Sequence, residues 1–435
     1  MRDPGAVLFR SAERVVTART FLHAAHRLAA DLPAAASIVN LCRDRCHFAL
    51  AFAASVLRGQ TNLLASDRSA RRLHALADEF DDLVSISDDP AAPSPLPHRL
   101  MSPAWDAPAG DAANPDIEGG RIVAIVFTSG STGTAVAHPK RWGALATRSL
   151  AAGAHFGWAA AHPASLVGTV PPQHMYGFET TVLLPLHAAV SSWCGTAFYP
   201  ADIRRALGSV PAPRLLVTTP LQIRAMLQTD LVLPPLASIV SATAPLDAEM
   251  AAAAERRWDT EVLEIFGATE VGSIAGRRTI AGEAWITYPG VEVSRADDQT
   301  LVAAPFLAPT RLNDVIDVLS GEQFRLLGRQ TDLIKLGGRR ASLSGLNHIL
   351  TGIDGVADGV FVAPDDHVER PTARMMAFVV APTCSPDAIL AALRERIDPA
   401  FLPRRIIAVN ALPRDEVGKL PYQALVALRA RLVDP

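Results

Sequence analysis

The chain has 435 residues, of which 49% are hydrophobic and 20% charged, and its formal net charge is −3. This composition is that of a globular protein with room for two or three domains, and so small a net charge gives no global electrostatic case for binding nucleic acid. The N-terminus lacks an apolar signal core, and the longest apolar stretch is far shorter than the ~20 residues of a membrane helix. We therefore expect no membrane span and a cytoplasmic location.

Two of the four cysteines lie close together, in the sequence Cys42-Arg-Asp-Arg-Cys46-His47. Four scattered cysteines are too few for a disulfide framework. Close spacing of two cysteines and a histidine also occurs in metal sites, but no second ligand pair stands elsewhere in the sequence. We interpret these residues as structural thiols, with a metal site as the alternative.

The first part of the chain alternates helical and strand patterns. Amphipathic or Ala-rich patterns predict helices at 13–32, 47–58 and 66–80. Short apolar runs predict strands at 37–41, 62–65 and 83–86. Strands and helices that alternate at this spacing predict a parallel sheet covered by helices.

Residues 88–120 have a different composition, with prolines at 90, 93, 95, 97, 103, 108 and 115. Because proline cannot donate to a strand ladder or continue a helix, we expect a surface connection here rather than a strand or helix. The β-branched run at 121–127 that follows predicts a buried strand.

This strand leads into a polar loop without any apolar residue. Its glycines allow close approach of the backbone, and its hydroxyl groups add donors to a row of free N–H groups, so the loop predicts an anion site. A plain turn is the alternative, because Ser, Thr and Gly are also common in turns. The loop consists of Thr128, Ser129, Gly130, Ser131, Thr132, Gly133 and Thr134, with Lys140 a short distance beyond.

The alternation then resumes. Further helices are predicted near 142–153, 220–228 and 247–258, and further strands at 165–170, 214–218, 238–241 and 261–266. These are the parts of an α/β fold with a doubly wound, mostly parallel sheet, whose ligands bind beyond the carboxyl ends of the strands. The loops after residues 127, 170, 241 and 266 are therefore the places to look for chemistry.

The C-terminal portion changes character at Gly328-Arg329. Strand-like runs at 359–363, 375–380 and 405–409 surround a predicted helix at 386–397. We predict a large domain over 1–327 and a small α+β domain over 328–435.

A hydroxyl and a carboxylate, Thr269 and Glu270, follow the strand at 261–266 after a glycine turn. Because Mg²⁺ takes oxygen ligands and usually bridges a carboxylate to phosphates, Glu270 is the predicted metal ligand. A Thr-Glu pair by itself is also common as a helix cap. Similarly, His174 in the segment 171–178 by itself is compatible with a buried core histidine.

The ordered set of motifs resembles the adenylate-forming superfamily, which includes acyl-CoA synthetases, peptide-synthetase adenylation domains and luciferases. The loop at 128–134 resembles its phosphate loop, Phe266-Gly-Ala-Thr-Glu270 its [YF]-G-x-T-E motif, and Leu412 to Lys419 its C-terminal L-P-x-x-x-x-G-K motif. This resemblance implies ATP and Mg²⁺ as cofactors, a small carboxylic acid as substrate, and a small domain that moves as a lid.

The resemblance also assigns a role to each candidate residue. It implies catalytic roles for Lys419, Glu270, Thr269 and His174 and a phosphate contact for Lys140. It places the nucleotide and acyl group against Ala242, Thr243, Ala244, Phe266 and Gly267, the ribose against Asp314 and Arg329, and a thiol arm beside Gly337.

The reaction that the resemblance implies has two steps. The acid first attacks the α-phosphorus of ATP while Lys419 stabilises the developing charge, and the acyl-adenylate then reacts with a phosphopantetheine thiol after the small domain turns about residues 331–332. The short segment between Glu270 and Asp314 is similar to small ligases of bacterial aryl-polyene and xanthomonadin-type pigment pathways. We therefore expect an acyl carrier protein as the thiol partner.

Two alternatives stay open. The first is a ligase that uses free coenzyme A. The second is a non-catalytic nucleotide- or acyl-binding relative, which the stretched segment before Lys140, Asn313 and Thr331 would fit. The bulk of Trp193, Tyr176 and Phe178 and the small residues at 242–244 indicate a pocket for a hydroxybenzoate-like or short acyl group.

Overall fold

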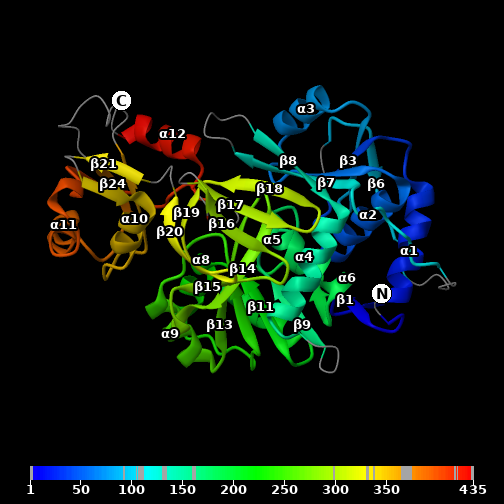
Figure 1. Ribbon diagram of the computed structural model, residues 1–435, viewed down its shortest axis with the longest axis horizontal. Coiled ribbons are helices and arrows are strands. Elements are labelled where there is room, and N and C mark those ends of the chain that lie inside the picture. Colours follow the sequence, from blue (N-terminus) through cyan, green and yellow to red (C-terminus); the bar gives the residue numbers. More distant parts are fainter. Residues whose placement is uncertain are drawn as a thin grey trace. The chain divides into compact units, whose positions relative to one another are not determined.

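A computed structural model describes residues 3–91, 94–103, 105, 112–129, 135–158, 163–296, 299–329, 333–336, 339–363, 375–415, 418 and 420–432. The chain divides into two compact units, which are described separately. The first comprises residues 1–292, 302–310 and 416–418, and the second comprises 293–301, 311–415 and 419–435. Figure 1 shows the elements of both units coloured along the sequence. Among the described residues, no helix is both long and apolar enough to cross a membrane.

The first sheet of the first unit has the strand order β6-β5-β3-β4-β7-β8. Its strands are β3 (Ser37–Asn40), β4 (Thr61–Leu64), β5 (Leu83–Ser87), β6 (His98–Leu100), β7 (Ile122–Ser129) and β8 (Ala135–Arg141). All neighbours run parallel except β7 and β8, which form an antiparallel pair. The expected parallel sheet is therefore confirmed. The edge strand β6 was not expected, because it lies within the proline-rich connection, which an edge position tolerates.

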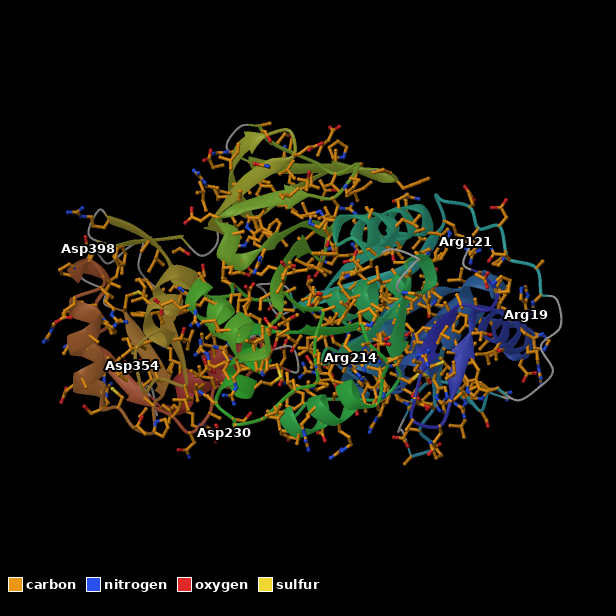
Figure 2. The ribbon with its side chains drawn as sticks, turned by 90° about the horizontal axis from the view of Figure 1, so that it is seen from below. Arg19, Arg121, Arg214, Asp230, Asp354 and Asp398 are labelled. Atoms are coloured by element: carbon orange, nitrogen blue, oxygen red, sulfur yellow. The ribbon has the colours of Figure 1, made fainter. Side chains whose placement is uncertain are left out.

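Three helices belong to this part of the chain: α1 (Ala18–Asp31), α2 (Arg45–Arg58) and α3 (Ala70–Glu79). Each begins at a side-chain cap, and in α2 the carboxylate of Asp44 accepts from the N–H of His47 at 3.0 Å. Helix α2 ends at Gly59, whose φ of 89° is a left-handed conformation that favours glycine. Arg121, labelled in Figure 2, donates to the carbonyl of Val56 near the end of α2.

The second sheet of the first unit has the order β15-β14-β13-β12-β11-β9-β10-β1-β2. Its strands are β1 (Val7–Arg10), β2 (Val15–Thr17), β9 (Ala164–Gly168), β10 (Val190–Trp193), β11 (Arg214–Thr218), β12 (Ser238–Ser241), β13 (Glu261–Ala268), β14 (Gly272–Arg278) and β15 (Ala284–Thr287). The strands from β1 through β10, β9, β11 and β12 to β13 are parallel, and β13, β14 and β15 follow as an antiparallel meander. The chain therefore begins within the second sheet, before it forms the first one.

The helices of this region are α4 (Trp142–His155), α5 (Met175–Gly177), the π-helical turn η1 (Phe178–Leu183), α6 (Leu184–His187), α7 (Pro200–Gly208), α8 (Pro220–Leu227) and α9 (Ala248–Trp258), with the 3₁₀ turn η2 (Thr279–Ala281). Helices α7, α8 and α9 cover a core that includes Ile203, Ile223 and Val262. Arg214 of β11, labelled in Figure 2, donates from its Nε to the carbonyls of Leu207 and Val210 at 2.9 Å each. These hydrogen bonds connect β11 to the C-terminal end of α7. Helix α4 contacts both β8 and β14, so it connects the two sheets.

The unit boundaries run through a three-stranded sheet of β16 (Glu292–Ala296), β17 (Gln299–Ala304) and β18 (Leu307–Leu312). The second unit then contains β19 (Asp314–Ser320), β20 (Gln323–Arg329), β21 (Leu333–Leu336), β22 (Arg339–Ser342), α10 (Leu343–Thr351), β23 (Asp358–Val362), β24 (Met376–Val380), α11 (Pro386–Arg394), the turn η4 (Pro399–Phe401), β25 (Arg405–Ala408) and α12 (Tyr422–Leu432). Its sheet β23-β24-β25 packs on helices through a core of Leu350, Phe361 and Ile389.

Candidate active site

The hairpin of β13 and β14 carries Thr269 and Glu270 in its turn. Gly267 faces Ser273 and Ala268 faces Gly272 across the ladder, which leaves residues 269–271 as the connection. The turn is tight, because the N–H of Val271 donates to the carbonyl of Ala268 at 3.1 Å. Both Thr269 and Glu270 are half-buried. The strand-and-glycine pattern therefore places this hydroxyl and this carboxylate together at one end of the second sheet.

Lys140 holds this turn from the first sheet. It lies on β8 opposite Ala124 and is 5% exposed, and its ammonium donates to the carbonyls of Thr269 and, at 2.8 Å, Glu270. The hairpin of β7 and β8 closes at Ser129 and Ala135, so Lys140 stands roughly 17 Å down the strand from that end. Residues 135–141 form a strand, and from it the Lys140 ammonium reaches the turn of the second sheet. A phosphate contact for Lys140 stays a prediction.

Glu179 and Arg148 bind Ser273 on β14, two residues beyond this turn. The carboxylate of Glu179 accepts from the N–H of Ser273 at 3.1 Å and from its hydroxyl at 2.5 Å. Arg148 of α4 donates to the carbonyl of Ser273. Gly272 has a φ of 86°, and a Cβ there would meet Glu179 Oε1 at 2.6 Å, so glycine is required at this point. Two buried cations, Lys140 and Arg148, and one buried anion, Glu179, thus bind this hairpin at its turn or just beyond it.

Burial shifts the titration of all three charged groups. The pKa of Lys140 is lowered from 10.5 to about 8 by burial, against the opposing effect of Glu179 and Glu270. The pKa of Glu179 is raised by burial, although Ser273, Arg148 and Lys140 act in the opposite direction. Burial also lowers the pKa of Arg148. Desolvation of a charge is costly unless a partner compensates it, and here the three groups compensate one another.

The segment 171–178 forms the connection after β9. His174 is half-buried and its Nδ1 accepts from the N–H of Tyr176 at 3.3 Å, which caps α5. The hydroxyl of Tyr176 donates to the carbonyls of Thr218 and Val240. Phe178 is fully buried and its ring packs on Phe52 at 5.0 Å. Phe178 therefore belongs to the hydrophobic core, whereas the sequence had indicated a pocket wall.

The segment after β12 is held by a buried carboxylate. Thr243 has a φ of 82°, Ala242 is buried and Ala244 is exposed. Glu264 on β13 accepts from the N–H of Leu246 at 3.2 Å and pairs with Arg277 at 2.6 Å. The backbone just after the predicted nucleotide-facing residues 242–244 is thereby bonded to β13, the strand that also carries Phe266 and Gly267.

The second unit brings the two predicted ribose residues into register. Asp314 and Arg329 are directly opposed in the antiparallel ladder of β19 and β20, and Asp314 is 6% exposed. The carbonyl of Asp314 accepts from the Thr300 hydroxyl at 2.5 Å. The side chain of Arg329 lies outside the described residues.

Several predicted site residues also fall outside the described ranges. They are Gly130, Ser131, Thr132, Gly133, Thr134, Gly337 and Lys419, together with the predicted hinge at 331–332. At the two ends of the phosphate loop, the backbones of Thr128 and Ser129 belong to β7, and the Thr128 hydroxyl lies 2.9 Å from Nε2 of His138. Beside Lys419, Gly418 has a φ of 80°, which again favours glycine.

Residues 17–305 match the family described as AMP-binding enzyme. The chain belongs to this family. It is an AMP-forming acid–thiol ligase. Enzymes of this family adenylate an acid with ATP and then ligate it to coenzyme A.

Two curated relatives illustrate the similarity of this AMP-binding enzyme to others. A 4-coumarate–CoA ligase of Rhodobacter capsulatus is 28% identical over 300 residues, which are 68% of this chain and 74% of the relative. A probable 2-succinylbenzoate–CoA ligase of Mycobacterium tuberculosis is 28% identical over 345 residues, which are 70% of this chain and 84% of the relative.

Solved structures share the fold of this AMP-binding enzyme. ATP-bound MatB from Rhodopseudomonas palustris has a TM-score of 0.82 at 18% identity and covers 99% of this chain and 97% of its own. The anthranilate CoA ligase AuaEII in complex with anthranoyl-AMP has a TM-score of 0.81 at 15% identity and covers 99% and 96%. The predicted α/β fold is confirmed.

The sequence reasoning missed Arg148 and Glu179. Glu179 is the only charged residue in the otherwise apolar and hydroxyl-bearing segment from Met175 to Leu186, and such an isolated charge in an apolar run signals a buried, paired group. The same signal marks Arg148, because it stands in an Ala-rich predicted helix. In the structure its side chain is 4% exposed. Both residues should have been candidates for the site.

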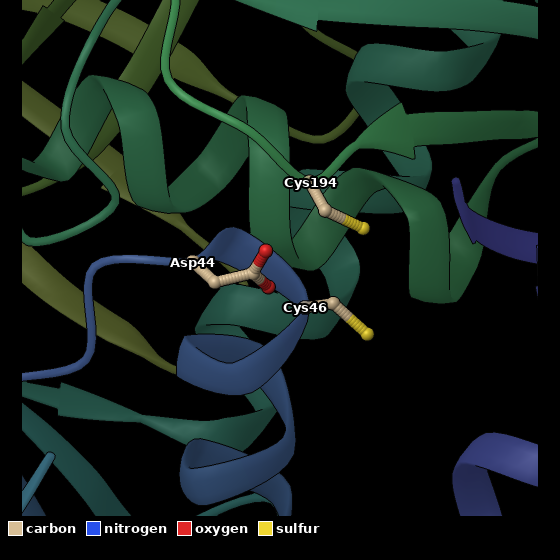
Figure 3. Close-up of side chains that lie close together, drawn as sticks. All are labelled: Asp44, Cys46 and Cys194. Carbon is tan, nitrogen blue, oxygen red and sulfur yellow. The ribbon is translucent and has the colours of Figure 1, made fainter. Parts of the chain in front are cut away.

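Two of the cysteines lie close together in space. Cys46 and Cys194 point their sulfurs in the same direction beside the carboxylate of Asp44 (Figure 3), and these three groups lie within 4.8 Å of one another. Burial raises the pKa of the Cys46 thiol, and Asp44 is engaged as the cap of α2. Protonated, buried thiols pack as small apolar side chains. Cys42 is not part of this cluster.

Proposed function

We propose that this AMP-binding enzyme converts an aryl or short acyl acid into its adenylate and transfers the acyl group to the phosphopantetheine thiol of an acyl carrier protein. The observation that carries this proposal is the turn at Thr269 and Glu270. Lys140 binds the backbone of this turn, and Glu179 and Arg148 bind Ser273 on the strand that follows it. A turn fixed this firmly places a carboxylate in a constant position, as phosphoryl chemistry requires.

The residues around the turn fit ATP and Mg²⁺. Among the described residues, no side-chain donor bonds to the Glu270 carboxylate, so its oxygens are available as the hard ligands that Mg²⁺ prefers. Glu270 would hold the ion, which supplies charge neutralisation at the phosphates. The loop at 128–134 and Lys140 would bind the phosphates. Residues 242–244 with Phe266 and Gly267 would line the base and acyl sites.

The remaining roles concern the acid, the ribose and the thiol. Thr269 and His174 would position the carboxylate of the acid, and Asp314 with Arg329 would bind the ribose, because a carboxylate accepts from both hydroxyls of a cis-diol. Gly337 would let the thiol arm pass close to the backbone. The large domain would span 1–327 and the lid 328–435.

The aryl preference is supported by the relatives, one of which is named for coumarate and another for succinylbenzoate. The short segment between Glu270 and Asp314 supports the further proposal of a hydroxybenzoate-like acid in a pigment pathway of the aryl-polyene type. Free coenzyme A is the competing thiol, since those same relatives are CoA ligases by name.

Carboxylate-dependent exchange of pyrophosphate into ATP tests the first half-reaction. We expect exchange with at least one acid of a panel of aryl and short aliphatic acids, and loss of at least about tenfold in Glu270→Gln, because the variant keeps the shape but not the charge. Glu283→Gln, at an exposed position, is the matched control. Absence of exchange with every acid would favour a non-catalytic relative.

Thiolation assays separate the two thiol partners. The adenylating enzyme is offered holo-carrier protein and coenzyme A in parallel at equal concentration. A higher kcat/KM for the carrier supports the proposal, whereas a preference for coenzyme A would replace the carrier protein with the free cofactor.

A further inference from the structure

His138 lies in the stretched segment that precedes Lys140. This segment, residues 135–139, belongs to β8, which is the edge strand of the first sheet next to β7. In the antiparallel ladder His138 stands opposite Val126, which is two residues from Thr128 on β7. Because alternate residues of a strand face the same side of a sheet, the side chains of His138, Lys140 and Thr128 share one face.

His138 is hydrogen-bonded to the first residue of the predicted phosphate loop. Its Nε2 lies 2.9 Å from the hydroxyl oxygen of Thr128, and both side chains are half-buried. Such a diagonal pair is within reach of long side chains in an antiparallel ladder. The bond therefore connects the first hydroxyl group of the loop to the adjacent strand.

The same face of β8 also carries the contact to the turn of Glu270. His138 precedes Lys140 by two residues, which is about 7 Å along a strand, and Lys140 donates to the carbonyl of Glu270 at 2.8 Å. Burial lowers the pKa of His138, Glu270 opposes this effect and Lys140 adds to it. Both charged groups thus act on the imidazole ring. His138 is therefore near the start of the phosphate loop and also near the residue proposed to hold Mg²⁺.

We propose that His138 is a positioning residue for ATP, because its Nε2–H donates to the Thr128 oxygen and thereby directs the hydroxyl proton of Thr128 toward a phosphate. This inference rests on the proposed function and adds to it the group that orients the first hydroxyl of the loop. An ionised phosphate only accepts hydrogen bonds, so Thr128 must donate its single proton to it. The Thr128 oxygen then accepts from His138, whose ring can supply the Nε2–H whether it is neutral or protonated.

The expected benefit of this bond is in binding ATP rather than in holding the two strands together. The backbones of β7 and β8 already pair from Ser129 and Ala135 down to Ile122 and Arg141. A threonine hydroxyl without a partner would distribute among staggered rotamers. Fixing its direction before ATP arrives lowers the entropy cost of the phosphate contact.

The test compares a variant without a donor with one that keeps it. Calorimetry would measure binding of the Mg²⁺ complex of α,β-methylene-ATP, and pyrophosphate exchange would measure KM for ATP. His138→Leu should bind the analogue about tenfold more weakly and raise KM by a similar factor, because one hydrogen bond is lost. His138→Gln should recover most of this loss, since its amide N–H can replace Nε2–H. His74→Leu, at an exposed position of α3, is the matched control.

A double-mutant cycle with Thr128→Val tests whether His138 acts through Thr128. If it does, the double variant should bind the analogue about as weakly as Thr128→Val alone, because no hydroxyl is left to orient. Losses that multiply would mean that His138 acts independently of Thr128. Equal binding by the wild type and His138→Leu, or a His138→Gln variant as weak as His138→Leu, would remove the role of the donor. Each of these three results overturns the inference.

The outcome is separable from that of the proposed function. Exchange with no acid in the wild type would overturn the proposed function, whereas binding of the ATP analogue reports the role of His138 without turnover. Thermal unfolding shows whether each variant is folded, and His138→Ala takes the place of His138→Leu should the latter be unstable.

Discussion

Lysine is rare in this chain. Among 41 Lys and Arg residues, only Lys140, Lys335 and Lys419 are lysines. Arginine serves at nearly every position where a positive charge alone is needed, so the three lysines mark places where a compact ammonium group that can lose its proton is useful. Lys140 and Lys419 both belong to motifs of the candidate site. At Lys140 the structure gives the reason, since one ammonium reaches two adjacent carbonyls.

Replacement of Lys140 by methionine tests its role as a support for the turn. We expect kcat to fall by about tenfold to a hundredfold and the Mg²⁺ requirement to rise, because the loss of charge-assisted hydrogen bonds, about 1.5–3 kcal/mol each, releases Glu270. Steady-state kinetics at varied ATP and Mg²⁺ measure both effects, with the exposed Arg141→Gln on the same strand as control. A rise in KM for ATP at unchanged kcat would point to a phosphate contact instead.

The titration of Lys140 predicts the alkaline limb of the rate profile. Its pKa is lowered to about 8, so the ammonium deprotonates as the pH rises through that value and its hold on the turn weakens. Activity should therefore decline above about pH 8. In Lys140→Arg the positive charge persists, so the fall in activity should move to higher pH. This shift is expected even if the variant has a lower maximal activity. A limb at the same pH in both enzymes would assign it to another group.

The lowered pKa of Lys140 also makes the stability of the folded state depend on pH. In the unfolded chain Lys140 titrates near 10.5, and in the folded chain near 8, so the unfolded state binds more protons between these values. The unfavourable contribution of the buried ammonium is fully present below about pH 8 and is relieved as the pH rises toward 10.5. The lysine is therefore retained against a cost in stability, as expected of a functional group.

At the scale of the element, the N-terminus of α2 is a second buried support. Arg45 is fully buried, and its guanidinium donates to the carbonyls of Gly168, Gly195 and, at 2.9 Å, Val170. Burial lowers its pKa to about 10, which still leaves it charged at neutral pH. This arginine fixes the end of β9 and the start of the segment that carries His174. A helix that connects two strands of the first sheet thus helps to position a loop of the second sheet.

Replacement of Arg45 by methionine should destabilise the protein by roughly 3 kcal/mol or more, because it leaves buried carbonyls without donors. Urea unfolding measures the change. Arg58→Met at the other end of α2, where the side chain is exposed, is the matched control and should cost less than about 0.5 kcal/mol. If the two variants were equally stable, water would have to replace the guanidinium at those carbonyls.

The elements of the large sheets could largely be predicted, and the supports of the site could not. Helices α1, α2, α4 and α9 and most of the parallel strands follow from hydrophobic periodicity, whereas the parallel strands β1 and β10 were not predicted. Strand β8 was missed because Ala135 to Arg141 has no strand pattern and is held by pairing with β7. The turn η1 was missed because a π-helical turn has the same composition as an α-helix.

The site divides in the same way. Motif residues such as Thr269 and Glu270 could be found because they are local in sequence. Of their supports, Lys140 was a candidate with a different predicted role, a phosphate contact, and Arg148 and Glu179 were missed. The three come from three elements and meet only through tertiary packing. An isolated charge in an apolar segment was the one usable signal for the last two.

At the scale of the whole molecule, the residues proposed for the two half-reactions are divided between the two units. The predicted phosphate loop and Glu270 belong to the first unit, whereas Lys419 and the predicted thiol glycine, Gly337, belong to the second. Under our proposal, Lys419 serves the adenylation step and Gly337 the thiol step. The two half-reactions would then use different placements of the proposed lid, with a hinge at 331–332.

Lys419→Ala tests this division of labour. Removal of the ammonium should abolish carboxylate-dependent pyrophosphate exchange, because the charge that builds up between the acid and the α-phosphate in the transition state is no longer neutralised. Transfer to the thiol from a supplied acyl-adenylate should stay within about threefold of the wild type, since that step would use the other face of the lid.

Gly337→Val should show the opposite pattern, with exchange retained and thiol transfer lost, because a side chain would obstruct the thiol arm. The two variants together form a crossed comparison in which each is the control for the other. Equal loss of both half-reactions in both variants would mean that a single arrangement of the lid serves the whole reaction. A retained exchange in Lys419→Ala would transfer the charge-neutralising role to another cation, and Lys140, already bound to the turn of Glu270, would be the first to test.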